Sequence, residues 1–149
     1  LWTTLFSSAK SRIRMLICDE VIYNKEDYYK EFSLALNKAL NNDVKVDILL
    51  LQNSHIHENI QILENYRHIN KDRIELRLCD KEKIQNINYN GNDITSNSIS
   101  FEIYDTNAYR VELLRMNHLS ICAFNDPKEV KKLSSIFDSI YSMGSKYKL

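Results

Sequence analysis

Glycine and proline are nearly absent from this chain of 149 residues, which contains 2 glycines and 1 proline. Because so few residues interrupt regular backbone, the sequence predicts long helices and strands. Asparagine and serine must then form many of the turns. The length suits one domain with a real core and leaves no room for two.

An excess of charge of one sign is also lacking, since 20 basic and 20 acidic residues give a formal net charge of zero. This balance weighs against a domain held on nucleic acid mainly by counterion release. The C-terminal end is locally basic, and we interpret this cluster as a solvated face. Its members are Lys128, Lys131, Lys132, Lys146 and Lys148.

Paired cysteines and long apolar runs are missing as well. Cys18, Cys79 and Cys122 have no C-x-x-C spacing, and each sits in an apolar or strand-like stretch. We expect reduced, buried thiols in a cytoplasmic protein, with no metal site and no cofactor. No apolar run approaches the roughly 20 residues needed to span a bilayer. The first residues, LWTTLF, are typical of the middle of a helix, so we expect the C-terminal domain of a longer protein.

Hydrophobic periodicity predicts alternating helices and strands. Helices are expected at residues 1–10, 25–41 and 57–68 and from Pro127 onward, and strands at 12–19, 44–51, 73–79, 98–104, 109–114 and 119–124. This order predicts a single α/β domain over residues 1–149, with a mixed β-sheet flanked by helices on both faces.

Three segments of this order resemble one repeat of the phospholipase D-like superfamily. They are SAKSRIRMLI, then NNDVKVDILLL after an amphipathic helix, and ICAFNDPKEVKKLSSIFDSIY at the end. Asp43 takes the place of the glycine that the family usually has before the position of Val44. The resemblance covers nearly the whole chain and implies a phospholipase D-like fold.

The family's activity needs two copies of a His-x-Lys-x-x-x-x-Asp motif, from two repeats or from a homodimer. In SISFEIYD, Ser98 stands at the histidine position, Ser100 at the lysine position, and Asp105 is retained. A hydroxyl does not replace the imidazole nucleophile without an activating base. The resemblance therefore implies a degenerate, non-hydrolytic domain, and a single repeat of this kind implies a homodimer.

Other polar residues are candidates for the same cleft. Tyr109, Arg110 and Glu112 are expected to line it beside Asp105, where Arg110 is able to clamp an anion or to pair with Asp105 or Glu112. His55 and His57 follow a buried strand, where parallel sheets place ligand loops. No third metal ligand is evident beside them, so a solvated loop is the simpler interpretation.

Two classes of function remain open from the sequence. The first is a binding or assembly module whose partner is a second copy, another protein, an N-terminal domain of the same chain, or a phosphate or nucleic-acid ligand. The second is a phosphodiesterase or nuclease with a rearranged active site that uses His55, His57 or His118.

Overall fold

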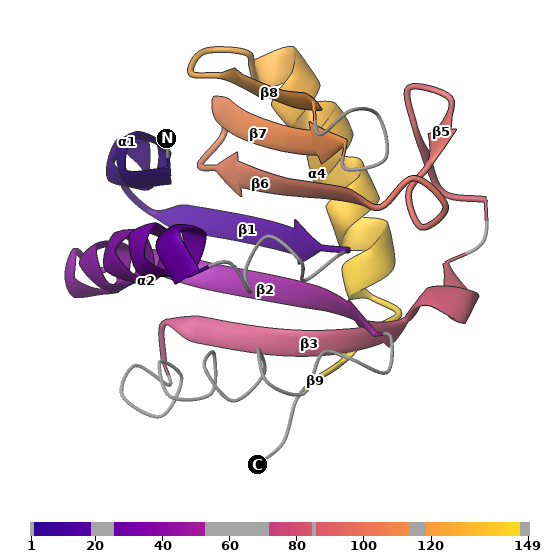
Figure 1. Cartoon of the computed structure of the whole chain (residues 1–149), viewed down its shortest axis with the longest axis horizontal. Coiled ribbons are helices and arrows are strands. Elements are labelled where there is room, and N and C mark those ends of the chain that lie inside the picture. Colours follow the sequence, from indigo (N-terminus) through magenta and orange to yellow (C-terminus); the bar gives the residue numbers. More distant parts are fainter. Residues whose placement is uncertain (1, 19–25, 53–71, 85, 114–118, 147–149) are drawn as a thin grey trace.

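A computed structural model of the chain describes residues 2–18, 26–52, 72–84, 86–113 and 119–146 (Figure 1). The helices are α1 (Trp2–Ser8), α2 (Glu26–Asn41) and α4 (Pro127–Tyr141), and a short 3-10 helix covers Lys81–Lys83. The long strands are β1 (Arg12–Ile17), β2 (Lys45–Gln52), β3 (Ile74–Asp80), β6 (Ile99–Tyr104), β7 (Ala108–Leu113) and β8 (Leu119–Ala123). Three strands of two residues complete the list: β4 (Asn88–Tyr89), β5 (Asn92–Asp93) and β9 (Ser145–Lys146).

The described strands form one seven-stranded sheet in the order β8-β7-β6-β1-β2-β3-β9, beside a small β4–β5 hairpin. Strands β1, β2 and β3 run parallel, whereas β6 is antiparallel to β1 and continues into β7 and β8 as an antiparallel meander. The sheet is therefore mixed, as the sequence predicts.

Helices cover both faces of this sheet, with α1 and α2 in front and α4 behind in the view of Figure 1. The front face packs Phe6, Leu36 and Met15 in one hydrophobic cluster, and the rear face packs Phe101 and Phe137 in another. Neighbouring strand residues point to opposite faces, so each central strand contributes to both clusters. The predicted α/β class is confirmed.

Helix α2 ends where the sequence predicts, and its end explains Asp43. The Val44 amide donates to the Ala39 carbonyl at 3.1 Å, and the Asp43 amide donates to Leu40 at 3.3 Å. This is the hydrogen-bond pattern of a Schellman motif, in which the residue after the cap adopts a left-handed backbone. Asp43 has a φ of 64°, which is why a glycine suits this place.

Helix α4 begins at Pro127, and Asp126 caps it by accepting a hydrogen bond from the Glu129 amide at 3.2 Å. Proline suits the first turn because the amide that it lacks has no partner within the helix. The buried face of α4 consists of Val130, Leu133, Phe137 and Ile140. This helix packs behind the sheet against β3, β6 and β7, and so holds in place the two strands that carry the candidate site, β6 and β7.

Candidate functional site

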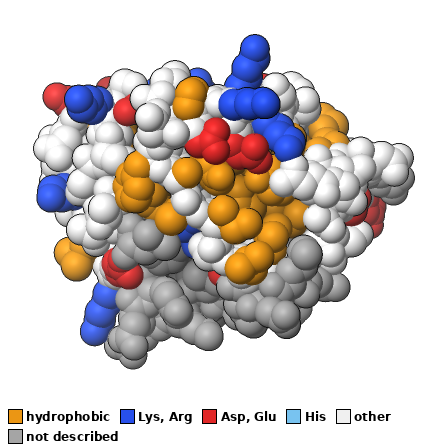
Figure 2. All heavy atoms as spheres, turned by 90° about the horizontal axis from the view of Figure 1, so that it is seen from above, with side chains coloured by type: hydrophobic (Ala, Val, Ile, Leu, Met, Phe, Trp, Pro, Cys, Tyr) orange, Lys and Arg blue, Asp and Glu red, His pale blue; other side chains and the backbone are white. Residues whose placement is uncertain are grey.

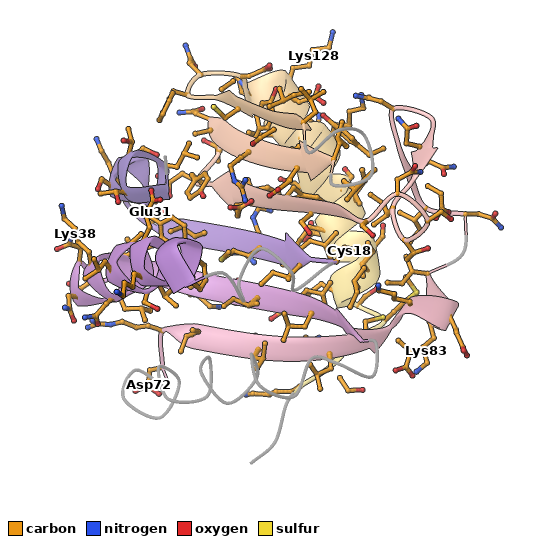
Figure 3. The ribbon with its side chains drawn as sticks, viewed as in Figure 1. Cys18, Glu31, Lys38, Asp72, Lys83 and Lys128 are labelled. Atoms are coloured by element: carbon orange, nitrogen blue, oxygen red, sulfur yellow. The ribbon has the colours of Figure 1, made fainter. Side chains whose placement is uncertain are left out.

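The segment SISFEIYD, from Ser98 to Asp105, contains β6, a central strand of the sheet. The strand begins at Ile99, one residue later than predicted, because Ser98 has a φ of 48° and belongs to the preceding turn. Ser98 and Ser100 are both buried. The Ser100 hydroxyl accepts a hydrogen bond from the Cys18 amide at 2.9 Å, and Figure 3 shows Cys18 at the end of β1.

A buried ionic cluster follows Ser100 on the same face of the sheet. Arg110 of β7 donates from Nε to Glu102 Oε1 and from Nη1 to Glu112 Oε2, each at 3.0 Å. Its Nη1 also lies 3.5 Å from the Ser120 hydroxyl of β8. All three charged side chains are buried, with exposed fractions of 1% for Glu102, 6% for Arg110 and 8% for Glu112.

Strand register explains why these groups meet. Glu102 is opposite Arg110, and Glu112 lies between Ser100 on one side and Ser120 on the other. Residues directly opposite in antiparallel strands bring their Cβ atoms within about 5 Å. The Arg110–Glu112 pair that the sequence offered is present. Glu102 was missed, although its place two residues after Ser100 puts it on the same face.

Asp105 lies at the other end of β6 and is a clamp for the start of β1. Its Oδ2 accepts from the Lys10 amide at 2.8 Å. Its Oδ1 accepts from the Ser11 amide at 3.0 Å, the Ser11 hydroxyl at 2.9 Å and the Arg12 amide at 2.9 Å. An extended strand of this length separates Asp105 from Ser98 by about 20 Å, so Asp105 does not orient a group at Ser98.

The environment of Asp105 favours its charged form. Partial burial alone raises the pKa of the carboxyl, but the amides of Arg12, Lys10 and Ser11 with the Ser11 hydroxyl outweigh it. The pKa of Asp105 therefore lies below its usual range. Of the two pairs that the sequence left open for Arg110, the structure has the pair with Glu112 and not the one with Asp105.

Tyr109 does not share the cleft with Arg110 and Glu112, contrary to the expectation from sequence. It packs in the rear hydrophobic cluster with Val130 and Leu133 of α4. Burial there, and the nearby charges of Asp126 and Glu129, raise the pKa of Tyr109. Adjacent residues of a strand face opposite sides, so Tyr109 and Arg110 cannot line one surface.

The histidine candidates His55, His57 and His118 lie outside the described residues, so they stay predictions. Among the residues that the structure describes, no three histidine, cysteine or acidic side chains come close enough to hold a metal ion.

No helix within these same ranges is both long and apolar enough to cross a membrane. Cys18 and Cys79 are buried free thiols, whereas Cys122 on β8 is exposed, and its predicted burial is wrong.

This arrangement of strands and helices is a phospholipase D-like α/β fold. It is similar to a phospholipase D family member, Nuc from Salmonella typhimurium, with a TM-score of 0.68 and 17% identity over 99% of this chain and 89% of that one. It is also similar to TrmBL2, an archaeal chromatin protein with a novel mode of DNA binding, with a TM-score of 0.64 and 18% identity.

The match to TrmBL2 covers 97% of this chain but 48% of that protein, so the chain spans about half its length. No model of a known protein family matches the sequence, and no curated protein sequence matches it. At such low identity the two structural likenesses establish the fold alone.

Proposed function

We propose that this chain is a non-hydrolytic phospholipase D-like domain that works as an assembly and binding module. The main support for the proposal is the burial of Ser98 and Ser100, which stand at the positions of the family's histidine and lysine. Both are buried, and the Ser100 hydroxyl already accepts the Cys18 amide. A serine nucleophile needs a base that removes its proton. Glu102 and Glu112, the carboxylates on the same face of the sheet as Ser100, are bound to Arg110.

The charge of this cluster also argues against a phosphate clamp of the family's kind. One guanidinium faces two carboxylates, so the three side chains together carry a net charge of −1. A phosphate placed beside them meets two like charges, and Arg110 has to leave its own partners to bind it. This arrangement favours a role in assembly, with a second copy or another protein as partner, over anion binding in the cleft.

The proposal predicts that the purified chain does not hydrolyse phosphodiesters. We expect no release of nitrophenolate from bis(p-nitrophenyl) phosphate and no cleavage of plasmid or single-stranded DNA above the buffer rate. Replacing Ser98 or Ser100 by alanine should leave that background unchanged. Turnover that disappears in Ser98→Ala would contradict the proposal.

The alternative, a phosphodiesterase with a rearranged site, makes a different prediction in the same assay. It requires turnover that survives Ser98→Ala and Ser100→Ala and is abolished by alanine at His55, His57 or His118. A matched change at His68 serves as control, because no catalytic role is assigned to it. That combination of results would replace the assembly role by an enzymatic one.

A nucleic-acid role is the second candidate, and the likeness to a DNA-binding chromatin protein favours it. The exposed lysines Lys128 and Lys131 in the first turns of α4 are basic groups available for phosphate contacts, and Figure 3 labels Lys128. The candidate predicts binding of a short labelled duplex by fluorescence anisotropy, and the affinity should fall steeply with salt. Lys128→Ala with Lys131→Ala should weaken binding at least several-fold, whereas Lys38→Ala on α2 should not. Failure to bind at low salt would remove this candidate.

A further inference from the structure

Strand β8 forms an exposed edge of the sheet. Within the described ranges it pairs with β7 on one side, and no strand lies on its other side. All of its residues from Leu119 to Cys122 are exposed, and Ala123 is partly exposed. An edge strand of this kind presents a row of backbone donors and acceptors to any strand that approaches it.

The sequence of this edge lacks the usual protection against pairing. Its five residues, LSICA, contain no charged residue and no proline. Charged residues and proline are the common features that prevent an edge strand from pairing with a strand of another molecule. Three of the four large exposed hydrophobic side chains among the described residues lie here: Leu119 (49%), Ile121 (41%) and Phe124 (49%). Figure 2 views the molecule from the β8 side and shows exposed hydrophobic side chains gathered there.

Two of these hydrophobic side chains, Leu119 and Ile121, share one face of β8, whereas Phe124 follows the strand. Leu119 and Ile121 are opposite Leu113 and Val111 of β7, which belong to the cluster beneath α4. Leu119 and Ile121 therefore extend the apolar rear face of the sheet to β8, its last described strand on this side. A second strand added to this edge extends that surface and covers side chains that are otherwise about half exposed.

We propose that β8 is a self-association edge, which pairs antiparallel with β8 of a second copy around a two-fold axis at Ile121. In this register Leu119 faces Ala123 of the copy, and Ser120 faces Cys122. A large side chain thus meets a small one, a small polar side chain meets a thiol, and no charges of like sign oppose each other. A two-fold contact of this type uses the same surface twice and closes at a dimer.

This inference rests on the assembly role proposed above and assigns it a surface. It differs from a dimer in which the two Ser98 positions meet. Pairing through β8 leaves β7 and β8 of each copy between the two β6 strands, which places these strands about 24 Å apart at the usual strand spacing. Measured mass and cross-linking report on this surface, whereas hydrolysis assays report on the absence of catalysis, so the two proposals fail separately.

The first test is the mass of the whole chain by light scattering after gel filtration. We expect twice the chain mass for the wild type, and a monomer for Ile121→Lys, because two lysines then meet at the axis without a counter-ion. Leu34→Lys is the matched control, since Leu34 is 71% exposed on α2, away from this edge, and its variant should stay dimeric. Circular dichroism verifies that each variant is folded. A monomeric wild type, or a dimer that survives Ile121→Lys, overturns the proposal.

A second test needs no destabilising charge. Directly opposite residues of antiparallel strands have Cα atoms about 4.5–5.5 Å apart, a separation that a disulfide accepts. Ile121→Cys combined with Cys122→Ser should therefore form a covalent dimer under mild oxidation, whereas Leu34→Cys combined with Cys122→Ser should not. A chain that remains dimeric in solution but fails to cross-link through position 121 overturns β8 as the contact.

Discussion

Replacement of Arg110 by methionine is expected to lower the free energy of unfolding by about 3–5 kcal/mol, the usual cost of removing one partner from a buried ion pair. Glu102 and Glu112 each bind Arg110 at 3.0 Å, and their exposed fractions are 1% and 8%. Without the guanidinium, two carboxylates remain close together and poorly solvated. Equilibrium unfolding in urea measures the loss.

An exposed arginine provides the matched control for Arg110→Met. Arg73 pairs with Asp43 at 2.5 Å, but the two side chains are 44% and 78% exposed. An ion pair in water contributes at most about 1 kcal/mol, and the hydrogen bond from Arg73 to the Leu40 carbonyl at 2.9 Å adds about 1 kcal/mol, so Arg73→Met should cost less than Arg110→Met. Adding Glu102→Leu to Arg110→Met should recover part of the loss. If Arg110→Met costs no more than Arg73→Met, water or another cation solvates the two carboxylates.

The described helices and long strands could be predicted because each carries its own local pattern, whereas the helix expected at residues 57–68 lies outside the described residues and stays a prediction. The apolar residues of α2 recur at three- and four-residue spacing, and Phe32, Leu36 and Leu40 of this stripe are buried as expected. Pro127 and the capping acid before it determine the start of α4 from local backbone chemistry alone. Short strands such as β9 could not be found, because two residues carry no period and depend on pairing with β3.

The candidate site was harder to predict because it depends on contacts between distant segments. Three of the four hydrogen bonds to Asp105 come from backbone amides of residues 10–12, more than 90 positions away, and a pattern of side chains does not reveal such partners. Tyr109 was misplaced for a local reason, since the two-residue period of strands already separates it from Arg110. The exposure of Cys122 follows from the place of β8 in the sheet, which its own sequence does not encode.

The second large effect is expected at Asp105, where alanine should cost about 2–3 kcal/mol of unfolding free energy. The Asp105 carboxylate accepts four hydrogen bonds from residues 10–12. A hydrogen bond to a charged group contributes about 1.5–3 kcal/mol when it is buried, and each of these contributes less because the carboxylate is partly exposed to water. The backbone adds to the loss, because Asp105 has a φ of 56°, which alanine adopts poorly. Asp105→Gly removes the same bonds without that backbone cost, so it should be less harmful than Asp105→Ala.

The dependence on pH tests whether the charge of Asp105 is what stabilises the fold. Its pKa in the folded chain lies below its usual range, so its contribution is fully present above the unfolded pKa of about 3.9. That contribution is lost as the pH falls through the folded value. The stability difference between the wild type and Asp105→Asn should thus be constant near neutrality and shrink in acid. A difference in unfolding free energy that stays constant below the folded pKa of Asp105 would mean that the hydrogen-bond geometry of the side chain, and not its charge, stabilises the start of β1.

In either case Asp105→Asn should leave the dimer mass unchanged at neutral pH, because Asp105 binds the start of β1 and lies two strands from the β8 edge.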